Sequence, residues 1–245
     1  MRRLFEVRPA EHLRVMPGRE TFLAELGAAG SCVVKRSHGA GWRERLRERW
    51  HGRAPRSAGR HEFEVLEAFA RLSLRVPRAL AWCEEADGRS LVVMERIEHT
   101  ETLRERAARA SASERRSLAT DLLSSVLRLH RAGWIHRDLY LQHFLVRAHD
   151  GALVLIDVGR ARHAESTGRR WLVKDMAALA HSTPTVVSVR ERVRFLAAYL
   201  DGIGVMERVE RRRFARDIEK KRALMAAHVP VSERAPSSRR VERRA

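Results

Sequence analysis

The chain has 245 residues, of which 44% are hydrophobic, enough to form one sizeable core or two lobes that share a cleft. Lysine and arginine number 49 against 31 aspartates and glutamates, and the formal net charge of +18 favours an anionic partner or surface. No apolar run approaches the ~20 residues of a membrane span and no signal-peptide pattern is present, so we expect a cytosolic protein.

The same basic composition has a simpler interpretation, in which arginines are spread over solvated helix faces. Nucleic acid is the less favoured anionic partner, because aromatic residues make up only 6% of the chain and no basic stripe is interleaved with them. Cys32 and Cys83 lie in apolar, strand-like runs, which favours buried and reduced thiols over a disulfide framework.

The first hundred residues carry five short strand signals separated by turn-forming stretches. The predicted strands cover residues 12–16, 21–26, 31–36, 78–83 and 90–96. One helix is predicted over 61–72, where Phe63, Leu66, Phe69 and Ala70 recur at helical spacing. These elements predict a small antiparallel lobe.

From Ser111 onward the pattern becomes mainly helical. Ser111 and Glu114 form a capping box, and the helix that follows ends at Gly133. Residues 143–157 are typical of a hairpin that turns at 150–151, and a second capping box at Ser188 opens a helix that Gly202 closes. A basic helix is predicted over 206–228, with Val209, Phe214, Ile218 and Leu224 on its packed side. The predicted organisation is a sheet-rich lobe over 1–97, a helical lobe over 98–229 and a disordered basic tail over 230–245.

Four side chains occur in an order that suits phosphoryl transfer. This reaction requires cations on the phosphates, acidic ligands for Mg²⁺ and a carboxylate that positions the attacking hydroxyl. Lys35 lies on the third strand, Glu62 lies on the helix after it, and Asp138 follows the long helix in the sequence His-Arg-Asp-Leu. Asp157 ends the second strand of the hairpin, so a single hairpin separates the two carboxylates. Each feature alone is weak, but chance rarely supplies all four in this order.

The sequence His-Arg-Asp-Leu at 136–139 begins the catalytic-loop pattern of protein kinases, H-R-D-L-x-x-x-N, but His143 stands where that pattern has asparagine. His130, His136 and His143 could suggest a metal cluster. Their spacing across a helix end and a loop instead favours structural or hydrogen-bonding roles for His130 and His136.

The stretch HRDLYLQHFLV resembles the catalytic loop of the lipopolysaccharide kinase family, which phosphorylates heptose or Kdo sugars and has histidine at the position of His143. Further stretches that resemble the family are GRETFLAEL, HGAGWRE, HEFEVLEAF and RRWLVKDMAAL, which begin at residues 18, 38, 61 and 169. The resemblance implies an α+β, two-lobed protein-kinase-like fold with an antiparallel-sheet N-lobe and a helical C-lobe.

The resemblance also implies roles for individual residues. Asp138 would be the catalytic base, Lys35 and Glu62 the phosphate-positioning pair, Asp157 the metal ligand and Asp175 a structural carboxylate beneath the catalytic loop. His143 would lie beside the metal, as a ligand or as a hydrogen-bonding residue. Contacts to ATP are expected from Lys35, Gly18, Glu95 and Ile97, with Mg²⁺, or alternatively Mn²⁺, as the metal.

Two departures from protein kinases are informative. The glycine loop G-x-G-x-x-G is absent, and Gly27 and Gly30 precede Lys35 so closely that they are expected to form the turn between the second and third strands. The turn that covers the phosphates is therefore expected around Pro17 and Gly18. The segment from Asp157 to Asp175 is too short for an activation loop with an A-P-E motif, which favours a sugar acceptor over a peptide.

The sequence therefore predicts an ATP-dependent kinase for a sugar hydroxyl of the lipopolysaccharide inner core. Its expected partners are the core glycolipid and the anionic inner face of the cytoplasmic membrane, where it would be peripheral. Two alternatives remain: a kinase for another small-molecule or protein acceptor, and a pseudokinase that serves as a binding module.

Overall fold

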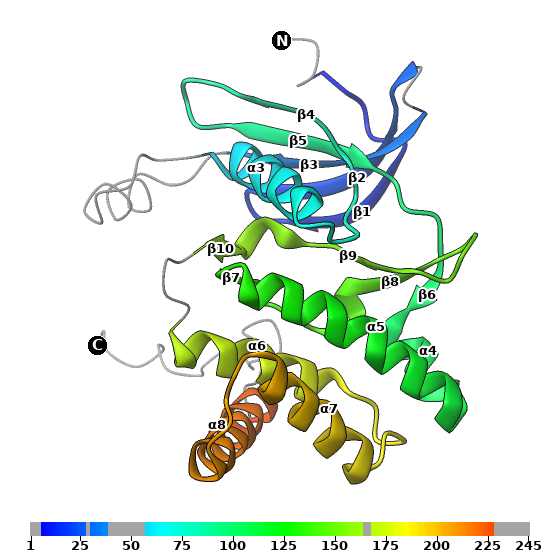
Figure 1. Ribbon diagram of the computed structural model, residues 1–245. Helices are drawn as coiled ribbons and strands as arrows, with labels where there is room; N and C mark the ends of the chain where they lie inside the picture. The colour runs from blue at the N-terminus through cyan, green and yellow to red at the C-terminus, as the bar shows by residue number, and fades with distance from the viewer. Residues whose placement is uncertain (1–5, 28–29, 39–56, 164–167, 228–245) are drawn as a thin grey trace, which may run out of the picture.

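The computed structural model describes residues 6–27, 30–38, 57–163 and 168–227, and Figure 1 shows them arranged in two lobes. The upper lobe contains a five-stranded antiparallel sheet in the order β1-β2-β3-β5-β4, with helix α3 beside it. Its elements are β1 (Glu11–Met16), β2 (Arg19–Glu25), β3 (Ser31–Ser37), α3 (Ala58–Arg71), β4 (Ala79–Glu84) and β5 (Ser90–Glu95). All five strands predicted for this part of the chain are confirmed.

Helix α3 begins three residues earlier than predicted. Ser57 caps it by accepting a hydrogen bond from the amide of Arg60, and Arg60 occupies the position where a capping box would have glutamate. The apolar spacing begins only at Phe63, which is why the prediction placed the start late. The first turn contains Gly59, where an added Cβ would lie 2.5 Å from the carbonyl oxygen of Leu91 in β5. Glycine at 59 therefore lets the helix approach the sheet closely.

The lower lobe is mainly helical. Its helices are α4 (Leu103–Arg109), α5 (Ala112–Arg131), α6 (Arg169–Ser182), α7 (Val189–Gly202) and α8 (Arg208–Ala226). Short strands lie between these helices and the upper lobe (Figure 1): β6 (His99–Thr102), β8 (Phe144–Arg147) and β9 (Leu153–Leu155) form one antiparallel sheet, and β7 (Trp134–Ile135) pairs with β10 (Arg162–His163).

The hairpin predicted over 143–157 is confirmed as β8 and β9, and both predicted capping boxes are present. Five of the α-helices and strands were not predicted: α4, α6 and the strands β6, β7 and β10. Helix α4 had a readable signal, because Thr102 and Glu105 form a third capping box. The strands are two to four residues long and have too little pattern to be read from sequence.

The prediction for the packed side of α8 is half wrong. Phe214 and Ile218 are buried, but Val209 and Leu224 are 78% and 59% exposed. At about 100° per residue, Phe214 and Ile218 lie about 40° apart around the helix, whereas Val209 lies about 140° from Phe214 and Leu224 about 120° from Ile218. The two outer residues therefore cannot share the buried face.

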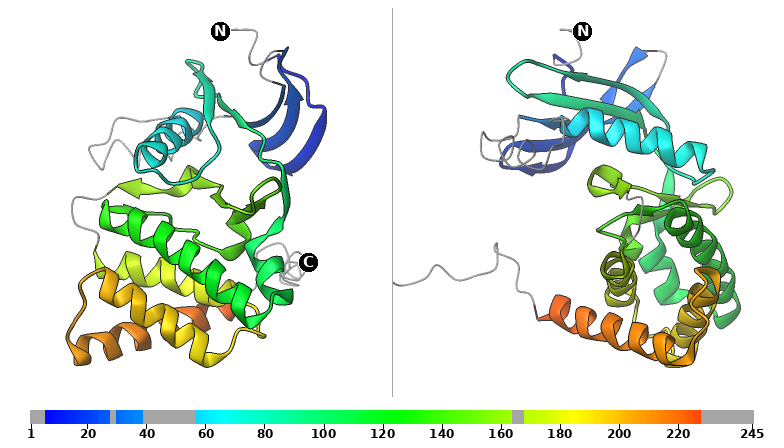
Figure 2. Two further views of the ribbon diagram at one scale, coloured as in Figure 1. Left: turned by 45° about the vertical axis from the view of Figure 1, so that its right-hand side comes forward. Right: turned by 60° about the vertical axis from the view of Figure 1, so that its left-hand side comes forward.

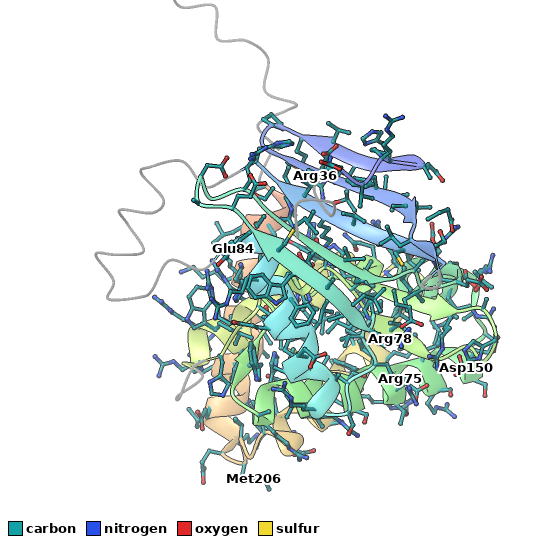
Figure 3. The ribbon with its side chains drawn as sticks, turned by 90° about the horizontal axis from the view of Figure 1, so that it is seen from above. Arg36, Arg75, Arg78, Glu84, Asp150 and Met206 are labelled. Atoms are coloured by element: carbon teal, nitrogen blue, oxygen red, sulfur yellow. The ribbon has the colours of Figure 1, made fainter. Side chains whose placement is uncertain are left out.

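The two lobes share one hydrophobic core. Val65, Leu66 and Phe69 of α3 belong to the same cluster of buried side chains as residues of α5, β8, β9 and α6. A second cluster, which includes Phe22, Leu91 and the buried cysteines Cys32 and Cys83, lies on the other face of the upper sheet. The chain after α3 also touches the lower lobe, because the amide of Leu155 donates to the carbonyl of Arg75, which is labelled in the view from above (Figure 3).

None of the helices in the described residues is long and apolar enough to cross a membrane. The stretch HGAGWRE from residue 38 and the tail predicted over 230–245 lie largely or wholly outside the described residues, so the structure does not address them. The boundary predicted between residues 97 and 98 falls in the short link from β5 to β6, and the assignment of 1–97 and 98–229 as two domains remains a prediction.

Candidate active site

Lys35 and Glu62 form a buried ion pair where the upper lobe faces the lower one. Strand β3 alternates its side chains, so Cys32 and Val34 enter the outer cluster while Val33 and Lys35 point toward α3. The Lys35 ammonium lies 2.5 Å from Oε1 of Glu62, whose side chain is 3% exposed. Burial lowers the pKa of Lys35, but Glu62 and Asp157 together outweigh it and the pKa is raised. The lysine is therefore firmly cationic.

Asp157, which belongs to the lower lobe, contacts the same lysine. Its Oδ1 lies 2.9 Å from the ammonium of Lys35, so this ammonium joins β3, α3 and the segment after β9. Burial raises the pKa of Asp157, yet the neighbouring Lys35 ammonium more than offsets burial and the pKa is lowered to about 2. The carboxylate is ionised at neutral pH and can act as a cation ligand. Its backbone is left-handed, with φ 57° and ψ 49°, a conformation that aspartate tolerates better than most residues.

The surroundings of Val158 and Gly159 explain why valine and glycine follow Asp157. Val158 is fully buried in the shared core, which anchors the segment. A Cβ added to Gly159 would lie 2.9 Å from Oε2 of Glu62, a distance that real Cβ atoms essentially never show. Glycine at this position therefore allows the segment to pass directly beside the buried glutamate. The same Oε2 accepts a hydrogen bond of 3.2 Å from Arg19.

Asp138 lies in the loop between β7 and β8 and is held by an arginine from the neighbouring segment. Nη1 of Arg160 lies 3.1 Å and 2.8 Å from the two carboxylate oxygens of Asp138, whose side chain is 19% exposed. The carboxylate therefore lies near the surface with a cation in contact. In this arrangement a substrate hydroxyl would have to share or displace the contact to Arg160.

A second, fully buried aspartate shapes the loop that carries Asp138. Oδ2 of Asp175, on α6, accepts a hydrogen bond of 2.7 Å from the amide of His136, and Oδ1 accepts one of 2.8 Å from the amide of Arg137. Arg137 has a φ of 75°, which is unusual for a non-glycine residue, and the carboxylate holds its amide in that conformation. The position beneath the loop that the resemblance implied for Asp175 agrees with this geometry.

His130 extends this network. Its Nε2 lies 3.4 Å from Oδ2 of Asp175 and its Nδ1 lies 2.8 Å from the hydroxyl of Tyr199. An ionised carboxylate can only accept, so Nε2 carries the proton and Nδ1 accepts from the tyrosine. His136 is also fully buried, its pKa is lowered by that burial, and neither ring nitrogen has a hydrogen-bond partner among the described residues. Both histidines lie in the interior of the lower lobe.

His143 is oriented toward Asp157. Its Nδ1 lies 2.8 Å from the backbone carbonyl oxygen of Asp138, which can only accept, so Nδ1 carries the proton of the neutral ring. Nε2 then has a free lone pair, and it lies 3.9 Å from Oδ2 of Asp157. The pair could contribute one nitrogen and one oxygen to a cation. Among the described residues no group of three or more His, Cys, Asp or Glu side chains has the geometry of a metal site.

The residues predicted to contact ATP are spread over the upper lobe. Gly18, with φ 75°, makes the turn between β1 and β2, immediately before Arg19, which contacts Glu62. Gly27 and Gly30 form the next turn, as predicted, and also have positive φ. Glu95 is exposed at the end of β5, and its amide and its carboxylate are both bonded to the backbone of Arg78.

Ile97 lies half-buried in the link between the lobes, and its carbonyl oxygen lies 3.0 Å from Nδ1 of His99. The roles of Gly18, Glu95 and Ile97 toward ATP remain predictions.

Sequence reasoning missed two cations of the site, Arg19 and Arg160. Arg160 directly follows the Asp-Val-Gly stretch, and Arg19 directly follows the turn predicted to cover the phosphates. Among 49 lysines and arginines neither has a distinguishing local pattern. Only the fold brings them to Asp138 and Glu62.

An ion pair of the upper lobe, Lys35 with Glu62, meets Asp157 of the lower lobe next to the loop that carries Asp138, which is the arrangement expected of a kinase-like phosphotransferase site. Residues 10–199 match the model of the lipopolysaccharide kinase (Kdo/WaaP) family, and the chain belongs to this family. It is therefore a phosphotransferase, and membership of a kinase family implies the use of ATP.

Two relatives in sequence and one solved structure illustrate the similarity to known kinases. The lipopolysaccharide core heptose(I) kinase WaaP of Pseudomonas aeruginosa is 31% identical over 204 residues, which cover 76% of this chain and 75% of the relative. The 3-deoxy-D-manno-octulosonic acid kinase of Xanthomonas campestris pv. campestris is 32% identical over 137 residues, 54% of this chain and 52% of the relative. Among solved structures, the Cydia pomonella granulovirus kinase PK-1 matches with a TM-score of 0.49 and 15% identity, over 67% of this chain and 55% of that one.

Proposed function

We propose that this chain transfers the γ-phosphate of ATP to a hydroxyl group of a heptose or Kdo sugar in the inner core of lipopolysaccharide. The observation that carries the proposal is the joint arrangement of Lys35, Glu62 and Asp157 in direct contact, with Asp138 on the adjoining loop. Family membership supports the reaction class, and the names of the two relatives support a core sugar as the acceptor.

In this mechanism Asp138 orients the acceptor hydroxyl and accepts its proton as the phosphoryl group is transferred. Lys35, fixed by Glu62, contacts the phosphates of ATP and stabilises the charge that develops on them. Arg160 keeps the Asp138 carboxylate in place until a hydroxyl enters. The chain's own residues thus supply positioning and electrostatic stabilisation, which is most of what phosphoryl transfer requires.

Asp157 and His143 would hold the divalent cation, which supplies charge neutralisation on the phosphates when bound. The fit is reasonable, because Mg²⁺ in kinases is held by one or two protein ligands and completed by phosphate oxygens and water. Asp157 is an ionised oxygen ligand, and the free Nε2 of His143 faces it. An imidazole nitrogen suits Mn²⁺ better than Mg²⁺, so both metals belong to the proposal.

We place the enzyme at the anionic inner face of the cytoplasmic membrane, where its acceptor would be found. The net charge of +18 supports this location, and Arg212, Arg213, Arg216 and Lys220 of α8 are exposed. Each basic residue near an anionic leaflet contributes ~1 kcal/mol. Removing residues 231–245 should weaken binding to anionic vesicles, most strongly at low salt, and leave turnover of a water-soluble acceptor unchanged. Equal vesicle binding by both forms would contradict a role for the tail.

The direct test uses purified protein, ATP, Mg²⁺ and deacylated core oligosaccharide that lacks phosphate. Mass spectrometry should detect one added phosphate with the wild-type protein and none with Asp138→Asn. Phosphate transfer to a protein or to a small molecule, but not to core sugars, would favour the alternative kinases. ATP binding without transfer to any acceptor would favour the pseudokinase.

A further inference from the structure

Several cations lie near Asp138, and three of them have no role in the proposed mechanism. Arg137, Arg170 and Lys174 lie around the ring of Trp171, near the start of α6, at 5.4, 4.7 and 5.9 Å from its centroid. Arg160 contacts Asp138 itself. We call Arg137, Arg160, Arg170 and Lys174 the basic cluster.

Members of the basic cluster lie close enough to perturb one another. Burial lowers the pKa of Arg137, and the nearby cations Arg160 and Arg162 lower it further. Burial also lowers the pKa of Lys174, with further lowering by Arg160 and Arg137 that opposes the effect of Asp138. Like charges held together in partly buried positions are unfavourable unless an anion joins them.

The described residues supply too few anions for this cluster. Asp175 uses both carboxylate oxygens to accept backbone amides, and Asp138 contacts Arg160. Within the described ranges no ion pair joins Arg137, Arg170 or Lys174 to a carboxylate. The buried Nε of Arg137 also has no hydrogen-bond partner there.

We propose that the basic cluster is an anion-binding site for the acceptor, which binds a carboxylate or phosphate group of the acceptor glycan and thereby presents a neighbouring hydroxyl to Asp138. This inference rests on the proposed function and specifies its acceptor: a sugar that carries, or adjoins, an anionic group. Trp171 forms a flat apolar surface among the cations, and such surfaces suit the faces of sugar rings as well as guanidinium groups.

The site is distinct in position from the one expected to hold the ATP phosphates. Lys35 reaches Asp157 from the upper lobe, whereas Arg137, Arg170 and Lys174 belong to the catalytic loop and α6 of the lower lobe. Figure 2 shows the upper lobe, with its sheet and α3, above the mainly helical lower lobe that contains α6. If the cluster binds the acceptor, a substitution within it should therefore change the KM of the acceptor and not the KM of ATP.

The kinetic test compares two acceptors with three proteins. The acceptors are deacylated core oligosaccharide and the same oligosaccharide with its carboxylates reduced and its phosphates removed. The proteins are wild type, Lys174→Gln and the control Arg116→Gln, which removes the same charge from an exposed position on α5. Lys174→Gln should raise the KM for the anionic acceptor about tenfold or more, as expected for a lost charge-assisted contact. The KM for the reduced acceptor and for ATP should stay within about twofold.

Equal losses on both acceptors, or a raised KM for ATP, would overturn the inference, because the cluster would then act on folding or on the nucleotide. Arg170→Gln, at an exposed position, repeats the test if Lys174→Gln is unstable. Two further acceptors identify which anion is bound. One has only its carboxylates reduced, and the other has only its phosphates removed.

A binding measurement separates this inference from the proposed function. Inorganic phosphate is titrated into protein saturated with a non-hydrolysable ATP analogue, and tryptophan fluorescence is followed because Trp171 lies within the cluster. Wild type and Arg116→Gln should respond, and Lys174→Gln should respond about tenfold more weakly. No response in the wild type, or equal responses in all three proteins, would overturn the anion site. If phosphate binds as expected but no core oligosaccharide is phosphorylated, the proposed function fails and the anion site stands.

Discussion

The close passage of Gly159 beside Glu62 makes Gly159→Ala an informative perturbation. The added Cβ would lie 2.9 Å from Oε2 and 3.2 Å from Cδ of Glu62. Glu62 cannot easily withdraw, because Lys35 holds one carboxylate oxygen and Arg19 the other. Either the glutamate or the segment that carries Asp157 must therefore shift.

The expected effect on stability is small and the effect on activity is large. Overpacking a well-packed site typically costs ~1–3 kcal/mol. Gly159 does not have a positive φ, so alanine fits its backbone conformation. Alanine also stabilises the protein by ~0.4–1 kcal/mol, because it lowers the conformational entropy of the unfolded chain. The net destabilisation is therefore about 0–2.6 kcal/mol, which lowers the melting temperature by at most ~10 °C in a chain of this size. A shift of the Lys35–Glu62–Asp157 geometry by a fraction of an ångström to 1 Å should lower kcat/KM by about 10²-fold.

Thermal melting and steady-state kinetics on the purified protein test this expectation together. Gly168→Ala is the matched control, because a Cβ there meets no heavy atom of the described residues within 4 Å and its backbone is not left-handed. The control should melt and turn over like the wild type. Wild-type kcat/KM in Gly159→Ala would refute the reasoning, since it would mean that the contact between Gly159 and Glu62 does not set the geometry of the site.

Three further predictions concern the two aspartates and the histidine between them. Asp138→Asn should fold normally and lose about 10²–10⁴-fold in kcat, because the amide keeps the shape but cannot accept the proton; near-normal kcat would remove Asp138 from the base role. The pKa of Asp157 falls from ~3.9 when unfolded to about 2 when folded, so its contribution to stability is complete above pH ~4 and is lost as pH falls through about 2. Urea midpoints from pH 5 to 2 should therefore fall less steeply in Asp157→Asn than in the wild type, and parallel curves would contradict the ion pair with Lys35. His143→Asn should shift the metal preference of turnover from Mn²⁺ toward Mg²⁺; an unchanged preference with a lower melting temperature would assign His143 to its hydrogen bond with the backbone of Asp138.

The parts of the fold that could be predicted are those with a local cause. Alternating apolar residues and turn glycines located the five strands, and capping boxes located α5 and α7. Helix α8 shows the limit of such patterns, since apolar residues five or six positions apart do not share a face and Val209 and Leu224 are exposed. The buried side of α8 is determined by its packing against α6, and the residue pattern of α8 alone does not include that contact.

The same distinction holds for the site. Lys35, Glu62, Asp138 and Asp157 could be proposed because each has a fixed place in the order of elements, and three of them meet within hydrogen-bond distance. Arg160 could not be proposed, because its contact to Asp138 depends on how the segment after β9 turns back on the loop, 22 residues away. Contacts of this kind follow from tertiary packing and not from local sequence.

The hydrogen bonds of Asp175 have a consequence for how the chain is made. Every residue predicted to take part in chemistry precedes position 160, so all of them are synthesised before α6. The left-handed turn at Arg137 has its carboxylate partner only 38 positions later, and the chain from His130 through Asp175 to Tyr199 closes only when α7 has also emerged. The catalytic loop of a nascent or C-terminally truncated chain therefore lacks its support. A fragment that ends before α6 would contain all the predicted catalytic residues and would still be inactive, because Asp175 is missing. Phosphoryl transfer by the unfinished chain is disfavoured for the same reason.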